Sequence, residues 1–269
     1  MPMWYYKNMS DNKYILTTTH LSIGYKSKSK ENVIAKNINI ELEKGKLIAL
    51  IGENGIGKST LLRTLSGLKK PLAGAIHLNN KNLNEYSPVD LAQNLSLVLT
   101  EKLPTSNLTV FELIALGRQP YTNWIGKLNP DDLEKVNQAI ALTKIEHLSN
   151  KKYYEISDGQ FQNVLVARAL AQDTPLIILD EPSTHLDLFH KVSLFKLLKK
   201  LAAESNKCIL FSTHDIDLSI QLSDEMIVMT EDYFVQDQPC NLISKGIFDT
   251  LFKDENIKFD SEKGKFIVS

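Results

Sequence analysis

The chain has 269 residues, of which 43% are hydrophobic and 23% are charged. A chain of this length and composition can bury a large core, which excludes an intrinsically disordered protein. Its 31 Lys and Arg residues against 32 Asp and Glu residues give a formal net charge of −1, so we expect neither a polybasic surface nor a nucleic-acid partner.

The cysteine content and the hydropathy pattern bear on where the protein works. Two cysteines, Cys208 and Cys240, are too few for a disulfide framework and lack metal-binding spacing, which suits a reducing compartment. Residues 1–10 carry no secretion signal, and no stretch approaches the roughly 20 apolar residues that cross a bilayer. We therefore expect a cytosolic protein that reaches a membrane only by docking onto another chain.

Three short apolar runs predict buried strands, at Leu47–Ile51, at Leu176–Leu179 and at residues 208–211. Helical patterns of leucine lie between them, formed after the first run by Leu61, Leu62, Leu65 and Leu68, and before the third run by Leu194, Leu197, Leu198 and Leu201. Strands that alternate with helices predict a mostly parallel sheet covered on both faces. Such a sheet carries its functional sites at the carboxyl ends of its strands.

The middle of the chain, from about residue 97 to residue 161, has no convincing core strand. Helical patterns recur there, near residues 110–116, near residues 131–142 and from Phe161 onward. Asn129 followed by Pro130 and two acidic residues is typical of a helix start. These features predict a helical subdomain.

The last part of the chain reads as short strand-like pieces separated by turns. Residues 226–229 form one such piece after His214. The chain leaves little room there for a further domain.

Residues 52–59 read GENGIGKS and match the phosphate-loop pattern GxxxxGK[ST] between a predicted strand and a predicted helix. Glycines allow backbone N–H groups to turn inward around the phosphates of a nucleotide, with the helix dipole behind them. Lys58 adds a point charge at the β- and γ-phosphates, and the hydroxyl of Ser59 is a hard oxygen ligand for Mg²⁺. A glycine-rich turn that binds nothing is the alternative, which the flanking strand and helix disfavour.

The strand at Leu176–Leu179 is followed by two acidic residues, Asp180 and Glu181. An aspartate at a strand end can hold Mg²⁺ or its bound water, and the glutamate is then placed to orient and deprotonate an attacking water. One acidic residue for the metal and another for the water predict hydrolysis of ATP. A kinase would need a pocket for the phosphoryl acceptor, and we find none in the sequence. Alone, the same pair of acids would be a surface turn.

Residues 156–160 read ISDGQ and resemble the LSGGQ signature of the ABC-type ATPases, about 20 residues before Asp180 as in that family. Ser157 and Gly159, at the start of a predicted helix, can offer a hydroxyl and backbone N–H groups to an anion. An ordinary helix cap followed by glycine is the alternative. In the family, the anion is the γ-phosphate of an ATP molecule held by the other subunit of a head-to-tail dimer.

This resemblance covers the chain from about Ile15 to its end and implies an α/β P-loop NTPase fold. Its RecA-like core would hold a mostly parallel sheet with an antiparallel β edge, and an α-helical subdomain would be inserted into it. We expect a single ABC ATPase domain over residues 1–269. Its parts would be a catalytic core at 14–97 and 165–235, a helical subdomain at 98–164, and a C-terminal extension at 236–269.

The resemblance also implies roles for individual residues. Glu181, His214 and Lys58 would be catalytic, with His214 contacting the γ-phosphate. Tyr25 would stack on adenine, and residues 183–187 would lie along the dimer interface. The expected nucleotide-binding residues are Tyr25, Gly52, Asn54, Gly55, Gly57, Lys58, Ser59, Thr60, Ser157, Gly159 and Gln160. Packing for Tyr25, and a hydrogen-bonded turn for His214, are the alternatives.

The expected metal ligands are Ser59, Asp180 and Thr100. Thr100 departs from the family pattern, which has a glutamine at the junction between the sheet and the helical subdomain. A threonine hydroxyl can still ligate a hard cation or its water, but it is shorter and carries no amide. This departure bears on metal coordination and on coupling to a transporter through residue 100.

Residues 108–121 and 184–188 look most like ATPases of importers for iron chelates, haem and cobalamin. The resemblance implies a homodimer that encloses two Mg-ATP at the cytoplasmic face of the membrane, a partner permease, and indirectly a solute-binding protein. The permease would contact the helical subdomain, where Phe111, Leu113, Tyr121 and Trp124 are either exposed anchors or core residues.

Two rival functions follow from the same motifs. The first is a soluble ABC-type ATPase of DNA repair, translation or iron–sulfur assembly, but the tandem cassettes or coiled-coil insertions usual in those proteins are not found here. The second is an ATP-gated interaction module, in which Thr100 has weakened turnover.

Overall fold

The computed structural model describes residues 13–26, 31–99, 106–251, 257–261 and 263–268. Thr100 lies outside these residues, so the predicted metal ligand at this position stays a prediction. Among the described residues, no helix is both long and apolar enough to cross a membrane.

An antiparallel sheet contains the first strands of the chain, in the order β2-β1-β5-β6 with β3 paired to β1. Its strands are β1 (Tyr14–Lys26), β2 (Glu31–Ile38), β3 (Glu41–Glu43), β5 (Ala73–Leu78) and β6 (Lys81–Asn82). This sheet is the antiparallel β component that the family resemblance predicts.

A second sheet has the strand order β11-β10-β4-β9-β8-β7. All its neighbouring strands pair in parallel except β11, which is antiparallel to β10. The strands are β4 (Leu47–Ile51), β7 (Leu95–Val98), β8 (Leu176–Leu179), β9 (Cys208–Ser212), β10 (Glu225–Met229) and β11 (Phe234–Asp237). The three apolar runs and the piece at 226–229 are thus confirmed as strands.

The second sheet is buried on both faces, which explains its continuous apolar runs. In β4, Leu47, Ala49 and Ile51 pack in one core cluster, whereas Ile48 and Leu50 pack in the other. Successive side chains of a strand point to opposite faces, so one run supplies both cores. Cys208 of β9 is fully buried, as expected of a packing residue, and burial raises the pKa of its thiol.

The helices are α1 (Lys58–Leu65), α2 (Pro88–Asn94), α3 (Val110–Ala115), α4 (Pro130–Thr143), α5 (Asp158–Ala171), α6 (Leu188–Ser205), α7 (Ile216–Leu222) and α8 (Pro239–Ser244). Short 3₁₀-helices are η1 (Leu83–Glu85), η2 (Leu116–Tyr121), η3 (Glu146–Leu148), η4 (Tyr153–Glu155) and η5 (Ile247–Thr250), and the hairpin of β12 (Ile257–Asp260) and β13 (Lys265–Val268) follows.

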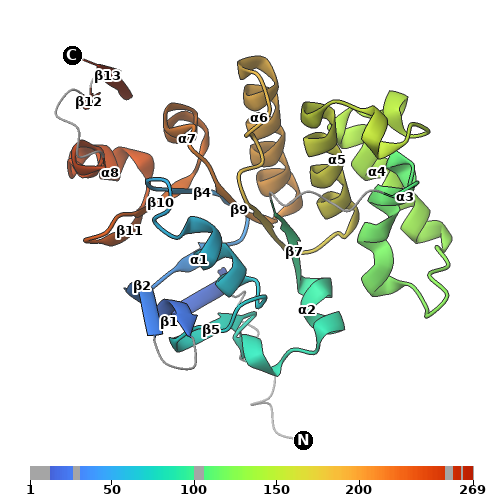
Figure 1. Ribbon diagram of the computed structural model, residues 1–269, viewed down its shortest axis with the longest axis horizontal. Coiled ribbons are helices and arrows are strands. Elements are labelled where there is room, and N and C mark those ends of the chain that lie inside the picture. The colour runs from blue at the N-terminus through green and yellow to red at the C-terminus, as the bar shows by residue number, and fades with distance from the viewer. Residues whose placement is uncertain (1–12, 27–30, 100–105, 252–256, 262, 269) are drawn as a thin grey trace, which may run out of the picture.

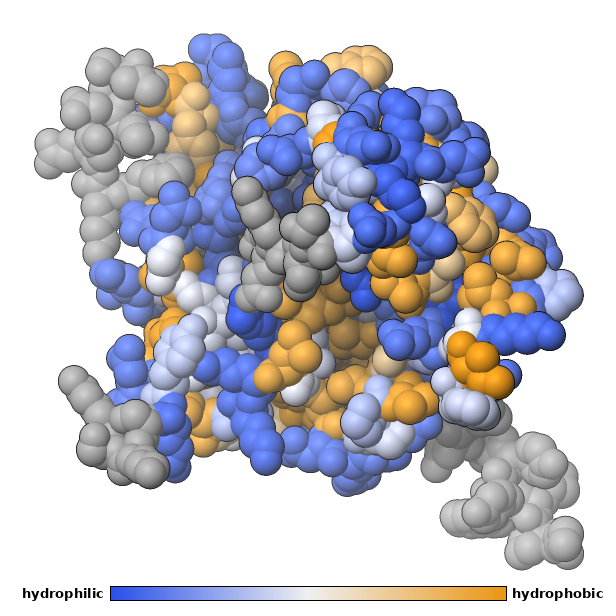
Figure 2. All heavy atoms as spheres, turned by 45° about the vertical axis from the view of Figure 1, so that its right-hand side comes forward, coloured by the Kyte–Doolittle hydropathy of each residue, from blue (hydrophilic) through white to orange (hydrophobic). Residues whose placement is uncertain are grey.

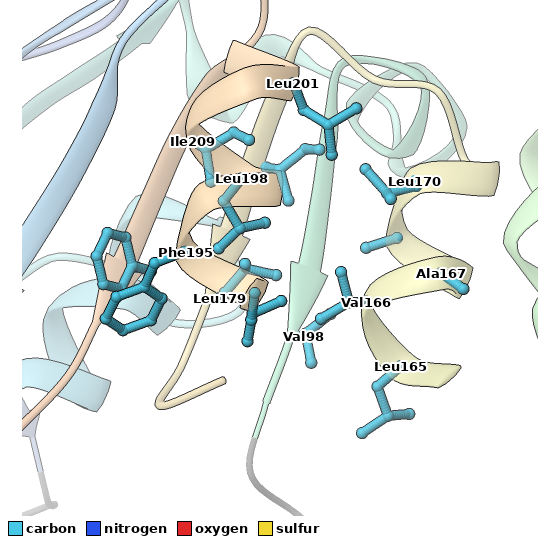
Figure 3. Close-up of a cluster of buried hydrophobic side chains, with 14 of the residues drawn as sticks. Val98, Leu165, Val166, Ala167, Leu170, Leu179, Phe195, Leu198, Leu201 and Ile209 are labelled. Carbon is cyan, nitrogen blue, oxygen red and sulfur yellow. The ribbon is translucent and has the colours of Figure 1, made fainter. Parts of the chain in front are cut away.

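Helices cover the parallel sheet on both sides (Figure 1). The leucines of α1 fill the core between the two sheets. On the opposite face, Figure 3 shows Phe195, Leu198 and Leu201 of α6 pointing toward the strands, with side chains of α5 beside them. Helices α3 and α4 pack against α5 on the side away from the antiparallel sheet.

Two local predictions were wrong. The first helix ends at Leu65, and Leu68 beyond it is 65% exposed. The turns predicted after His214 include two helices, α7 and α8. In α7 the apolar residues occur at every second position, which is a strand pattern, yet all four pack against the core from a helix of only two turns. Tertiary packing here overrides the local pattern.

The predicted start of α4 is confirmed. Asn129 is the N-cap and accepts a hydrogen bond from the backbone N–H of Asp132 at 2.8 Å, while Asp132 in turn accepts one from the backbone N–H of Asn129 at 3.0 Å. This reciprocal cap satisfies two backbone donors at the helix end.

Candidate functional site

The phosphate loop connects β4 to α1, where the sequence places it. Gly57 is the N-cap of α1 with a φ of 112°, and a Cβ there would lie 2.4 Å from Ile34. A Cβ on Gly52 would lie 2.3 Å from the carbonyl oxygen of Met229. Both positions therefore require glycine, one for its backbone conformation and close packing, the other for a close backbone approach.

The side chain of Lys58 is held over the phosphate loop by backbone carbonyl groups of the loop. Its Nζ donates hydrogen bonds to the carbonyl oxygens of Gly52 at 2.8 Å and of Glu53 at 3.0 Å. Burial lowers the pKa of Lys58, and the negative charges of Glu181 and Asp180 act in the opposite direction. The phosphate loop and the two carboxylates thus share one site at the carboxyl ends of β4 and β8.

Asp180 is 1% exposed and follows β8 directly. Its Oδ1 accepts a hydrogen bond from the hydroxyl of Ser212 at 2.6 Å, and the same hydroxyl oxygen accepts one from the backbone N–H of Glu181 at 2.9 Å. Ser212 ends the neighbouring strand β9. One buried hydroxyl therefore fixes both acidic residues, a role that the sequence analysis did not assign.

Glu181 and His214 are in direct contact. The Glu181 Oε1 and His214 Nε2 atoms are 2.6 Å apart, and the second carboxylate oxygen accepts a hydrogen bond from the hydroxyl of Thr184 at 3.2 Å. Glu181 also has a φ of 48°, an uncommon conformation for a residue with a side chain. Two predicted catalytic residues from different loops are thus brought together and held in a set orientation.

Asp215, next to His214, ties this site to the start of α6. Its carboxylate accepts hydrogen bonds from the hydroxyl of Ser183 at 2.8 Å and from Nζ of Lys191 at 2.7 Å. The loop after Glu181 is therefore anchored to the loop that carries His214. Sequence reasoning missed this link because Ser183 and Lys191 lie 32 and 24 residues from Asp215 along the chain.

Tyr25 lies beside the first turn of α1, which follows the phosphate loop. Its hydroxyl is 3.2 Å from the hydroxyl of Thr60 in the first turn of α1, and 54% of its surface is exposed. An exposed aromatic ring next to a phosphate-binding loop offers a flat apolar surface on which a base can stack.

The signature residues form the start of α5 and lie on a different surface. Ser157 and Gln160 cap this helix reciprocally, with hydrogen bonds of 3.2 and 3.1 Å between the side chain of each and the backbone N–H of the other. They line a hollow of about 520 Å³ together with Gly159, His185 and Asp187. No residue of the phosphate loop lines this hollow in the described parts of the chain.

The four apolar candidates in the helical region have different environments. Leu113 is 2% exposed and belongs to the core, and Phe111 packs against that core. Tyr121 is half-buried, with the guanidinium of Arg118 4.0 Å from its ring centroid. Trp124 is 94% exposed. Of the four, Trp124 has the exposure expected of an anchor for a partner, and Leu113 does not.

The residues present fit a magnesium ion. Ser59 offers a hydroxyl, and Asp180 offers a carboxylate oxygen, Oδ2, that has no hydrogen-bond donor among the described residues. Hard oxygen donors of this kind suit Mg²⁺.

The family model described as "ABC transporter" matches residues 35–184. The chain belongs to the ABC transporter family. This membership identifies it as an ABC-type ATPase and confirms the P-loop NTPase fold that the sequence predicts.

Named relatives of this ABC-type ATPase include two bacterial proteins. It is 37% identical over 238 residues to the achromobactin transport ATP-binding protein CbrD of Dickeya dadantii, an alignment that covers 88% of this chain and 87% of the relative. It is 38% identical over 214 residues to the iron(3+)-hydroxamate import ATP-binding protein FhuC of Bacillus subtilis, with 80% and 78% covered.

Solved structures show the same fold. A putative metal-chelate type ABC transporter in an inward-facing conformation matches with a TM-score of 0.77 and 26% identity, covering 94% of this chain and 95% of that one. The ATP-binding cassette MJ0796, in a dimeric post-hydrolysis state bound to ADP and Pi, matches with a TM-score of 0.73 and 25% identity, covering 83% and 98%.

Proposed function

We propose that this ABC-type ATPase is the ATP-hydrolysing subunit of an importer for an iron chelate. Its named relatives serve the transport of achromobactin and the import of iron(3+)-hydroxamates, and one similar structure is a metal-chelate type transporter. The sequence also allows an importer of haem or cobalamin, but the names of these three proteins mention neither compound. The chain would act at the cytoplasmic face of the membrane, bound to a permease. A solute-binding protein would deliver the iron chelate to this permease.

The observation that carries the catalytic part of this proposal is the contact between Glu181 and His214 beside the phosphate loop. The Glu181 carboxylate can accept a proton from an attacking water and orient it. Because a carboxylate can only accept a hydrogen bond, the Nε2–H group of His214 donates to Oε1 of Glu181, which fixes the orientation of the carboxylate. Lys58 and the backbone N–H groups of the loop stabilise the negative charge that develops on the transferring phosphoryl group.

Mg²⁺ would be held by Ser59 and Asp180, with Thr100 as a further ligand. When bound, the ion supplies positive charge that neutralises the phosphate oxygens. The Ser212 hydroxyl donates to Oδ1 of Asp180, so the other carboxylate oxygen, Oδ2, is the one that would bind the ion.

A head-to-tail homodimer would complete the site. Ser157 and Gly159 line a hollow that excludes the phosphate loop of the same chain, so one copy supplies only half of the groups that the family resemblance assigns to the γ-phosphate. A second copy can bring its own α5 start to the first copy's nucleotide. The dimeric state of the similar MJ0796 cassette supports this arrangement.

Exposed apolar surface supports the partnership with a permease. Figure 2 shows apolar side chains gathered in a recess on the displayed face. A hollow of about 530 Å³, apart from the phosphate loop and the signature, is lined by leucines that include Leu68, Leu91 and Leu97. Trp124 is exposed on the helical side. Contiguous apolar surface of this kind is typical of a protein interface.

The test is reconstitution with a candidate iron-chelate permease and a solute-binding protein, and measurement of uptake of a ⁵⁵Fe-labelled siderophore into vesicles containing ATP. We expect ATP-dependent uptake that is lost in Glu181→Gln. The Ser244→Ala variant changes an exposed residue that is not among the predicted site residues, so it should keep full uptake and serves as the control. Tight ATP binding without any turnover, alone or with the permease, would instead support an ATP-gated interaction module.

A further inference from the structure

One face of the exposed Tyr25 ring is in contact with the side chain of Lys69, a residue to which the sequence motifs assign no role. The Nζ atom of Lys69 lies 3.3 Å from the centroid of this ring. Lys69 has no carboxylate partner within the part of the chain that the structure describes, so its ammonium makes its principal charge contact with the aromatic face.

Two backbone contacts fix the position of Lys69. Its backbone N–H donates to the carbonyl oxygen of Arg63 at 3.0 Å, at the end of α1. Leu72, three residues on, donates from its backbone N–H to the carbonyl oxygen of Ser22 at 2.8 Å in β1. The segment that carries Lys69 therefore runs back along the strand that carries Tyr25, and the contact between them is built into the fold.

We infer that Lys69 occupies the adenine-stacking face of Tyr25 and competes with the nucleotide base. This inference rests on the proposed nucleotide site, in which Tyr25 stacks on adenine. A base and an ammonium group cannot both lie within van der Waals distance of one ring face. Binding of an adenine nucleotide then requires the ammonium to leave the ring, and Lys69 sets how much the base contributes to affinity.

The expected size follows from the contact that is lost. A cation–π contact at an exposed site weakens a competing ligand by about two- to fivefold. Removing the lysine also removes one positive charge from the chain, and this change acts on every phosphate ligand whether or not it has a base. The two effects separate when a ligand with the base is compared with one that lacks it.

The experiment measures the dissociation constants of ADP and of inorganic pyrophosphate for the full chain by calorimetry, in Mg²⁺. Their ratio, pyrophosphate over ADP, reports the contribution of the nucleoside. We expect this ratio to rise about two- to fivefold in Lys69→Ala. It should stay constant in Lys70→Ala, which removes the same charge from the exposed neighbouring position. In Tyr25→Ala the ratio should fall, and adding Lys69→Ala to that variant should have no further effect.

A ratio that stays constant or falls in Lys69→Ala, while Tyr25→Ala lowers it, would overturn the competition by Lys69 and leave the nucleotide site intact. A ratio unaffected by Tyr25→Ala would overturn both the competition and the stacking role of Tyr25. Failure of the proposed function itself would show differently, as ADP and pyrophosphate affinities that are unchanged in Lys58→Ala.

Discussion

Ser212 should govern both the stability of the sheet and the rate of hydrolysis, because its hydroxyl holds Asp180 and Glu181 at once. In Ser212→Ala the charge-assisted hydrogen bond to Asp180, 2.6 Å long, and the bond from the Glu181 backbone N–H, 2.9 Å long, are both lost. The first contributes about 1.5–3 kcal/mol and the second about 0.5–1.5 kcal/mol. We therefore expect the free energy of unfolding to fall by about 2–4.5 kcal/mol.

The effect on turnover follows from the backbone of Glu181. In the parent protein, the hydrogen bond from the backbone N–H of Glu181 to Ser212 supports the φ of 48° at Glu181. Because Ser212→Ala removes this bond, the Glu181 carboxylate should shift relative to the phosphate loop. A displacement of about 1 Å costs up to about 100-fold in rate, and we expect kcat to fall about 10- to 100-fold. The dissociation constant of ATP measured without Mg²⁺ should change little, because Lys58 and the loop backbone are untouched.

Urea unfolding and steady-state ATPase assays check both numbers, with Ser96→Ala as the matched control. Ser96 is 1% exposed in β7 of the same sheet, and its hydroxyl is 3.0 Å from that of Thr174. Its loss should cost about 0.5–1.5 kcal/mol in stability and leave kcat unchanged. A Ser212→Ala protein as active as Ser96→Ala would refute the reasoning that this hydroxyl orients the catalytic carboxylate.

Three further outcomes are expected. In Glu181→Gln, kcat should fall by about 10²–10⁴ while the dissociation constant of ATP stays within about twofold; an active variant would reassign the base. Because burial lowers the pKa of Lys58, ATP affinity should decline with rising pH already below 10.5, and in Lys58→Arg this decline should disappear. In the folded chain this lowered pKa also means that stability rises with pH through the same range. Asp132→Ala should lower the free energy of unfolding by about 3–5 kcal/mol, because Arg118, 2.9 Å from Asp132 and nearly buried, would lose its only ion-pair partner in the described chain; a urea midpoint near the parent's would contradict this.

Much of the fold could be predicted because its signals are local. The strands β4, β8 and β9 are short runs of apolar residues buried on both faces, and the start of α4 is marked by Asn129 and Pro130. The helix α7 could not be predicted, because its alternating apolar residues carry the period of a strand. The packing of those residues onto the core decides its conformation.

The site divides in the same way. Residues 52–59 and the pair Asp180 and Glu181 are contiguous motifs, so their chemistry is readable from the sequence. The roles of Ser212 and Lys69 depend on which segments the fold places together, β8 beside β9 and the end of α1 beside β1. No spacing within the chain encodes these neighbours.

The central claim is that one copy of the chain holds an incomplete hydrolytic site and that ATP joins two copies. The mass of Glu181→Gln in solution with Mg-ATP, measured by light scattering at proven nucleotide occupancy, tests it most directly. The account predicts a particle of twice the 30.4 kDa chain mass, which reverts to one chain in ADP. A particle of one chain mass with ATP bound would contradict it.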